Sequence, residues 1–242
     1  MQALILAGGL GTRLHSLLGD WPKPMAPIAD RPFLEYLLLQ LKKYGITEVI
    51  LCVGHKGELI QEYFHQGERW GLNIHYSCER ELRGTAGALK LAQEFIQGEN
   101  FLVMNGDSFV DLDLNVLIGY HRIKKALATV ALVKVPNIER YGAVEIDEAG
   151  KIVRFVEKGQ TKSPGLINGG IYVFQREVLE LIPEGRPVSL EHEVFPKLIG
   201  RGFYGLPLQG YFIDIGVPED YVRLQADPSR LLVAVNLKGK GG

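Results

Sequence analysis

The chain has 242 residues, 46% of them hydrophobic, which suits one compact α/β domain or one domain with a subsidiary lobe. Its 27 Lys and Arg residues are balanced by 28 Asp and Glu residues, so bulk charge gives no sign of a nucleic-acid-binding surface. The chain has no apolar run of membrane-spanning length and no basic, then apolar, leader at its start, so we expect a cytoplasmic protein without membrane contact.

The first predicted strand runs into a glycine-rich loop. Gln2–Leu6 is a short apolar run, and the sequence Ala-Gly-Gly-Leu-Gly-Thr-Arg follows it at residues 7–13. Glycines let the backbone approach a ligand closely, and free N–H groups of such a loop bind phosphate oxygens. Arg13, and Lys23 between two prolines, can add charge-assisted hydrogen bonds. This stretch therefore predicts a polyphosphate site.

Two better-known phosphate loops do not fit this sequence. The dinucleotide fingerprint Gly-x-Gly-x-x-Gly needs a glycine where the chain has Leu14. The Walker A loop needs Gly-Lys-Ser/Thr, where the chain has Gly11-Thr12-Arg13. A nicotinamide-dependent oxidoreductase is therefore disfavoured.

Strands and helices alternate after this loop. The patterns predict helices at Phe33–Tyr44 and Gly57–Phe64, and strands at Glu48–Val53 and Leu72–Cys78. Such alternation predicts a mainly parallel sheet with helices on both faces, and ligands beyond the carboxyl ends of its strands. The two cysteines lie in apolar, strand-like runs, which favours buried thiols over a disulfide or a metal pair.

Small and acidic residues mark three further points. Gly84-Thr85-Ala86-Gly87 opens a helix, either as a tight helix start or as a loop whose backbone contacts a nucleobase. The strand Phe101–Asn105 ends in Gly106-Asp107, and Asp214 stands before a glycine in the run Tyr211–Gly216. Carboxylates at such strand ends are suited to Mg²⁺, so Asp107 and Asp214 form a candidate pair for one divalent ion.

The second half of the chain is rich in predicted strands. These are Ala128–Val135, Ala143–Ile146, Ile152–Val156 and Leu166–Phe174. Little helix separates them, so we expect an antiparallel or mixed lobe that closes over the sheet without forming an independent domain.

The end of the chain carries three further patterns. Ser189–Ile199 is predicted as an amphipathic helix capped by Ser189, and we interpret its Glu191-His192-Glu193 run as the solvated face of that helix. Pro218 is suited to begin another helix. Leu231–Val235 is predicted as an edge strand.

The motif Gly-Gly-x-Gly-Thr-Arg-Leu at 8–14, followed by Pro-Lys-Pro-Met at 22–25, resembles the signature of the sugar-1-phosphate nucleotidylyltransferases, and the resemblance extends to about Gln225. It implies an α/β, Rossmann-like (glycosyltransferase-A-like) fold, with a mixed, mainly parallel sheet, helices on both faces and a smaller β-rich sugar-binding lobe. It also implies a nucleotidylyltransferase domain at 1–226 and a C-terminal tail at 227–242. Within the domain, 1–125 would bind the nucleotide and 126–226 the sugar phosphate.

The resemblance implies roles for individual residues. Arg13, Lys23 and Asp107 would be catalytic, and Asp107 and Asp214 would bind Mg²⁺. The nucleotide would contact Leu6, Ala7, Gly8, Gly9, Gly11, Thr12, Arg13, Lys23, Glu79, Gly84, Thr85 and Gly106. The sugar phosphate would contact Tyr141, Gly142, Glu157, Lys158, Asn168, Gly169 and Gly170.

Four stretches, at 84–87, 166–172, 189–191 and 210–216, resemble the guanylyltransferase branch of that family, for which the acceptor would be D-glycero-α-D-manno-heptose 1-phosphate. Guanine presents two donors on its Watson–Crick edge, which would suit the carboxylate of Glu79 or Glu81. The partners would be a nucleoside triphosphate and a sugar 1-phosphate, in nucleotide-sugar synthesis for lipopolysaccharide, and a homo-oligomer is compatible with this. A mannose 1-phosphate guanylyltransferase, a thymidylyl- or uridylyltransferase acting on a hexose 1-phosphate, and a non-catalytic nucleotide-sugar sensor remain alternatives.

Overall fold

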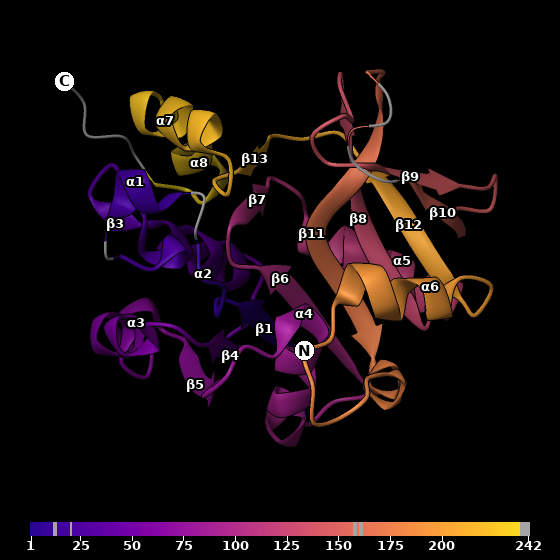
Figure 1. The fold of residues 1–242 in the computed structure, drawn as a ribbon, viewed down its shortest axis with the longest axis horizontal. Coiled ribbons are helices and arrows are strands. Elements are labelled where there is room, and N and C mark those ends of the chain that lie inside the picture. Colours follow the sequence, from indigo (N-terminus) through magenta and orange to yellow (C-terminus); the bar gives the residue numbers. More distant parts are fainter. Residues whose placement is uncertain (12–13, 20, 157–158, 160–161, 238–242) are drawn as a thin grey trace.

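The structure of the chain, a computed structural model, describes residues 1–11, 14–19, 21–156, 159 and 162–237. In this part of the chain the main sheet has seven strands in the order β12-β8-β11-β6-β1-β4-β5 (Figure 1). The strands are β1 (Gln2–Leu6), β4 (Glu48–Val53), β5 (Asn73–Cys78), β6 (Asn100–Asn105), β8 (Ala128–Val135), β11 (Gly165–Gln175) and β12 (Phe203–Leu208).

The sheet is mixed and mainly parallel, as predicted. β1 pairs in parallel with β4 and β6, and the pairs β4–β5 and β8–β12 are also parallel. β11 runs antiparallel to both of its neighbours, β6 and β8. It therefore joins two parallel parts, β6-β1-β4-β5 and β8-β12, into one sheet.

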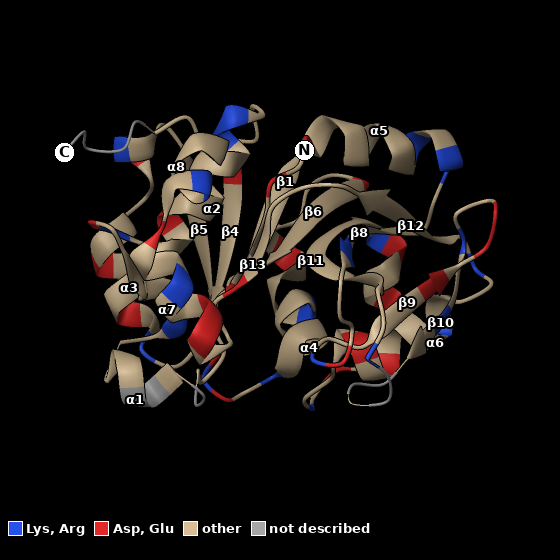
Figure 2. Cartoon of the chain, turned by 90° about the horizontal axis from the view of Figure 1, so that it is seen from above, with Lys and Arg blue, Asp and Glu red and all other residues tan. Residues whose placement is uncertain are grey.

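Helices cover both faces of the sheet, and Figure 2 shows α5 on one side and α4 and α6 on the other. Side chains of one strand face alternate sides, so Ala3 and Ile5 belong to one apolar core and Leu4 to the other. The first core includes residues of α2 (Phe33–Lys43), α3 (Gly57–Phe64), α5 (Leu114–Lys124), α7 (Pro218–Ala226) and α8 (Ser229–Ala234). The second includes residues of α4 (Gly84–Leu91), the 3₁₀ helix Ala92–Phe95 and α6 (Phe195–Leu198).

The second half is rich in strands, but its three long strands do not form a lobe of their own. β8, β11 and β12 extend the main sheet, and β8 is buried along its first six residues, as a strand covered on both faces should be. The hairpin of β9 (Ala143–Ile146) and β10 (Ile152–Val156) forms a separate two-stranded sheet. Short pairs join β2 (Pro27–Ile28) to β3 (Arg31–Pro32) and β7 (Ser108–Val110) to β13 (Phe212–Asp214).

The C-terminal residues return to the first half of the chain, where α7 and α8 lie near α1 (His15–Leu18) and α2 (Figure 1). The strand predicted at Leu231–Val235 is wrong, because this segment belongs to α8 and the turn after it. Leu231 and Ala234 are buried in the core beside α2, and Lys43 Nζ donates to the Ala234 carbonyl at 2.8 Å. A short apolar run fits a strand and a buried helix equally well, so periodicity alone cannot separate them.

Three further details differ from the sequence patterns. The helix α5 was not predicted, although Asp113 caps it by accepting from Asn115 N at 2.8 Å. The helix predicted at Ser189–Ile199 is divided into a π-helical turn, Leu190–Val194, and α6, and Ser189 caps it as expected. Cys52 is buried as predicted, but Cys78, at the end of the edge strand β5, is exposed.

Across the described residues, every helix is too short or too polar to cross a lipid bilayer.

Candidate active site

A cavity of about 340 Å³ lies at the carboxyl ends of β1 and β6. Its lining includes residues that follow three parallel strands: Gly8 after β1, Glu79 after β5 and Asp107 after β6. The sequence-predicted residues that line it are Leu6, Ala7, Gly8, Gly9, Lys23, Glu79, Gly84, Thr85, Gly106, Asp107 and Asp214. The structure therefore brings together residues from both ends of the chain at the edge of the sheet where ligands of such folds bind.

The glycine loop is held between neighbouring strands by backbone hydrogen bonds. Ala7 N donates to the Cys52 carbonyl at 2.8 Å, and Gly106 N donates to the Leu6 carbonyl at 2.9 Å. A Cβ at Gly106 would lie 2.6 Å from Leu6 O, closer than real Cβ atoms come. Gly106 thus permits the close approach of two strand ends directly beside Asp107.

A lysine and an aspartate from distant segments meet in this cavity. Lys23 Nζ donates to Asp107 Oδ2 at 2.9 Å, with 12% and 35% of the two side chains exposed. Lys23 begins the 3₁₀ turn Lys23–Met25, which follows Pro22, and a Cβ at Gly11 would lie 3.2 Å from Lys23 Cβ. Gly11 itself is not a lining residue of the cavity, but it packs against the side chain of Lys23, which is one.

The second predicted carboxylate lies on the strand next to Asp107. β13 pairs with β7 so that Asp214 is opposite Ser108, and Ile215 N donates to the Asp107 carbonyl at 2.9 Å. Asp214 Oδ1 accepts from Gly216 N at 2.7 Å, and both carboxylates line the cavity. Among the described residues no three His, Cys, Asp or Glu side chains form a metal-binding group. Asp107 and Asp214 nevertheless supply carboxylate oxygens, the ligands that Mg²⁺ prefers.

Glu79 is a half-buried acid on the other side of the glycine loop. Burial raises the pKa of its carboxyl, while the N–H and the charge of Arg83 oppose that rise. Its Oε2 accepts from Arg83 N at 3.0 Å, and its Oε1 lies beside Gly8. Glu81, the alternative considered above, is exposed and is not a lining residue of the cavity.

Asn168, on β11, organises the opposite wall. Its Nδ2 donates to Tyr172 OH at 2.9 Å and to Glu191 Oε1 at 3.2 Å, and its Oδ1 accepts from Gly170 N at 2.9 Å. Tyr172 and Glu191 line the cavity, whereas Asn168, Gly169 and Gly170 do not.

The glycines after Asn168 lie where the register of β11 shifts between Asn168 and Tyr172. Gly170 has a φ of +77°, and a Cβ there would lie 2.5 Å from Ser108 Oγ. Glycine at this position therefore allows β11 to bulge against β7.

Two more sequence-predicted residues do not line the cavity, and four lie outside the described residues. Tyr141 OH donates to Asp220 Oδ2 at 3.2 Å, and burial, followed by the charge of Asp220, raises the pKa of Tyr141 to about 12. Tyr141 and Gly142 are not among the lining residues. Thr12, Arg13, Glu157 and Lys158 lie outside the described residues.

The structure adds lining residues that the sequence patterns did not assign to the site, namely Pro24, Leu82, Ala88, Asn105, Tyr172, Leu190 and Glu191. Asn105 was visible as the last residue of a strand before Gly106. Glu191 is exposed, in agreement with the predicted solvated face, but it also lines the cavity, which the prediction of one regular helix did not indicate. Leu190 N donates to Thr85 Oγ1 at 2.8 Å, so this turn is tied to the start of α4.

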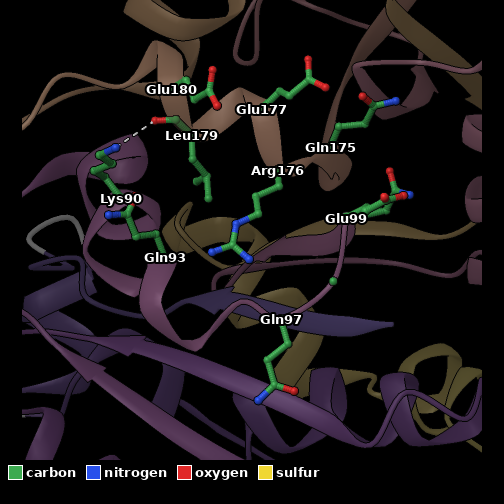
Figure 3. A pocket seen from close by; sticks show the side chains of 11 residues that line it. Lys90, Gln93, Gln97, Glu99, Gln175, Arg176, Glu177, Leu179 and Glu180 are labelled. Atoms are coloured by element: carbon green, nitrogen blue, oxygen red, sulfur yellow. Dashed lines mark hydrogen bonds between the residues drawn. The ribbon is translucent and has the colours of Figure 1, made fainter.

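A larger cavity, about 540 Å³, lies at the opposite end of β6 (Figure 3). Its lining includes Lys90, Glu99, Asn100 and Arg176. Arg176 Nη1 donates a hydrogen bond to the Ile96 carbonyl at 2.8 Å. Asn100 begins β6, so this cavity is at the amino end of a parallel strand. Ligands of open α/β sheets bind at the carboxyl ends, so the smaller cavity is the candidate active site.

Several known proteins are similar to this chain over nearly its whole length. The chain is 46% identical to the D-glycero-α-D-manno-heptose 1-phosphate guanylyltransferase of Campylobacter jejuni, over 91% of this chain and 97% of that protein. It is 42% identical to the protein of the same name from Aneurinibacillus thermoaerophilus, over 94% and 98%. It is also similar to the crystal structure of HddC from Yersinia pseudotuberculosis complexed with GMP-PN, with a TM-score of 0.83 and 35% identity over 94% of this chain and 99% of that one.

The sequence model described as "Nucleotidyl transferase" matches residues 2–229, which is nearly the whole chain. This match, together with relatives above 40% identity over nearly their full length, establishes that the chain belongs to the nucleotidyl transferase family.

Proposed function

We propose that the chain transfers the guanylyl group of GTP to D-glycero-α-D-manno-heptose 1-phosphate, with pyrophosphate as the second product. The observation that carries this proposal is the meeting of Lys23 and Asp107, 2.9 Å apart, beside Asp214 and the glycine loop. Two relatives at 46% and 42% identity bear the name of this activity, which supports the choice of GTP and of the heptose.

The reaction needs positioning and charge neutralisation more than proton transfer. A phosphate oxygen of the sugar 1-phosphate attacks the α-phosphorus in line, and the bond from that phosphorus to pyrophosphate breaks. The attacking oxygen is already anionic, so no general base is required. Lys23 lies where it can neutralise phosphate charge, and we assign the same task to Arg13.

Nucleotidyl transferases of this family generally use a divalent metal ion. We propose Mg²⁺, held by Asp107 and Asp214, because both carboxylates line the cavity: Asp214 ends β13, and Asp107 directly precedes β7, the strand paired with it. When bound, the ion would neutralise phosphate charge and favour departure of pyrophosphate. The chain's own contribution is to hold these two carboxylates and Lys23 at one edge of the sheet.

The remaining site residues divide between the two substrates. We propose that the glycine loop and the start of α4 bind the nucleotide, with Glu79 accepting from the N–H groups of guanine. Its side chain lies in the cavity beside Gly8, which supports this role. The β11 side would hold the sugar phosphate, together with Tyr141, Glu157 and Lys158. A cytoplasmic location and a homo-oligomeric state stay predictions.

Pyrophosphate release tests this function. The purified chain is assayed with GTP, UTP, dTTP, CTP and ATP against a panel of sugar 1-phosphates. We expect kcat/KM to be highest for GTP with D-glycero-α-D-manno-heptose 1-phosphate, by about tenfold or more over other pairs, since a pocket built for particular hydroxyls and base edges rejects substrates lacking them. A preference for UTP or dTTP would contradict the proposal.

The same panel measures the second candidate, mannose 1-phosphate. The chain is 40% identical to a mannose-1-phosphate guanylyltransferase of Mycobacterium tuberculosis, of which it covers 64%. A preference for mannose 1-phosphate with GTP would keep the guanylyl transfer and change only the acceptor. Absence of pyrophosphate with every pair would favour a nucleotide-sugar sensor.

A further inference from the structure

We propose that Glu191 determines acceptor specificity, by accepting a hydrogen bond from a hydroxyl group of the sugar. This inference rests on the proposed function, because it takes the β11 side of the cavity to hold the sugar 1-phosphate. Glu191 lines the cavity and comes from the turn Leu190–Val194; the resemblance at 189–191 gave this residue no role in the site.

The backbone of Glu191 is fixed by the helix that begins the nucleotide side of the cavity. Leu190 N donates to Thr85 Oγ1 at 2.8 Å, and Leu190 is 1% exposed. Just before it, Val188 N donates to the Arg83 carbonyl at 2.8 Å, and Val188 O accepts from Ala86 N at 2.9 Å. These bonds hold the π-helical turn against α4, so Glu191 projects from an anchored backbone.

The carboxylate of Glu191 is oriented from the β11 side. Its Oε1 accepts from Asn168 Nδ2 at 3.2 Å. The same Asn168 amide donates to the hydroxyl of Tyr172, which is 1% exposed. A carboxylate offers about four acceptor positions, and the hydrogen bond from Asn168 uses one of them. The exposed carboxylate therefore keeps acceptor positions for a ligand.

The chemistry of this group suits sugar hydroxyls and disfavours phosphate. An ionised carboxylate only accepts hydrogen bonds, so it pairs with O–H donors and repels the 1-phosphate group. Among the described residues Glu191 has no ion-pair partner, whereas Glu193, two residues further, pairs with Arg186 at 2.6 Å and is not a lining residue. Glu193 is therefore a matched control: a carboxylate on the same turn that already has a cationic partner.

The test compares Glu191→Ala, Glu191→Gln and Glu193→Gln with the wild-type enzyme in steady-state assays with both substrates varied. For Glu191→Ala we expect KM for the sugar 1-phosphate to rise about 10- to 100-fold, as for loss of one charge-assisted hydrogen bond, and KM for GTP to stay within about twofold. Glu191→Gln should show a smaller rise, and Glu193→Gln none. A rise in KM for GTP alone, or unchanged kinetics in Glu191→Ala, would overturn the proposal.

Monodeoxy analogues of the sugar 1-phosphate test which hydroxyl is read. We expect one analogue to lose about 10- to 100-fold in kcat/KM with the wild-type enzyme and to lose nothing further with Glu191→Ala. If every analogue loses the same factor in kcat/KM with the wild-type enzyme and with Glu191→Ala, the assignment of Glu191 to a sugar hydroxyl is overturned. If the wild-type enzyme prefers another acceptor, the proposed function fails, and the same comparison made with that acceptor still decides the role of Glu191.

Discussion

The two parts of the main sheet build their sides of the cavity in different ways. Around β1, β4 and β6 a glycine loop and backbone bonds such as Gly106 N to Leu6 O at 2.9 Å shape the site and position the charged pair Lys23–Asp107. Around β11 side chains from distant segments form it, as Asn168 bonds Glu191 across 23 positions of sequence. The first arrangement suits a phosphate chain common to all nucleotides, and the second suits a particular sugar.

Removing the charged pair of the first part should have the largest effect. We expect Asp107→Asn or Lys23→Ala to lower kcat by about 10²- to 10³-fold, because each deletes a group aimed at phosphate charge in the transition state. Asp107 is 35% exposed, so the far-ultraviolet circular dichroism and the melting temperature should change little. Pyrophosphate release under saturating substrates measures the loss.

Lys90→Ala is the control for this comparison, since Lys90 is a partly buried lysine that lines the larger cavity at the other end of β6. Its activity should stay within about twofold of wild type, because it lies apart from the site. Equal losses in Lys90→Ala and Lys23→Ala would show that the Lys23 effect is structural, and near-normal activity in Lys23→Ala would contradict the assigned role.

The backbone character of the first part predicts an effect on stability. Gly106→Ala should lower the free energy of unfolding by about 2–3 kcal/mol, because its Cβ would lie 2.6 Å from Leu6 O and the strand ends would have to separate. Gly9→Ala, where nothing lies within 4 Å of the added Cβ, should change it by less than about 0.5 kcal/mol. Denaturant unfolding measures the free energy of unfolding of both variants. A similar decrease in the two would refute the explanation by close approach of the strand ends.

A buried histidine between the two parts predicts an acid-sensitive junction. His121 on α5 contacts Thr129 of β8 at 2.9 Å and Asn100 of β6 at 3.0 Å. Burial, with a smaller contribution from Arg122, lowers the pKa of His121 to about 4. The unfolded chain, with an ordinary pKa near 6.5, therefore binds this proton first as the pH falls.

The contribution of neutral His121 to the free energy of unfolding should be fully present above about pH 6.5. It should decline towards pH 4, with a loss of about 2 kcal/mol at pH 5. The variant His121→Gln removes the titration, so the stability difference between wild type and variant should shrink as the pH is lowered from 7 to 5. A difference that stays constant over this range would contradict the assignment.

The same contrast explains what the sequence could reveal. The strand Glu48–Val53 and the helix Gly57–Phe64 were predicted with their observed bounds, because hydrophobic period and glycine signals are local. The approach of Asp107 to Lys23 followed from the rule that parallel strands end at one edge. The role of Glu191 did not, since it depends on a π-helical turn and on Thr85, 105 positions from Leu190. Likewise, no local sequence pattern indicates that β8, β11 and β12 join the main sheet, because this pairing connects segments far apart in the sequence.

The pairing of β11 on both of its edges has a practical consequence. Its interior residue Tyr172 lines the cavity; β8 pairs with it through backbone bonds at Gly165–Asn168 and Tyr172–Phe174, and β6 pairs with it from Ile171 to Gln175. Such bonds do not depend on which side chains the strand carries. Substitutions at Asn168 and at Glu191 can therefore retune the choice of sugar while the phosphate-handling edge is left untouched. This strand and its facing turn are the place to begin when redesigning the enzyme for a different sugar.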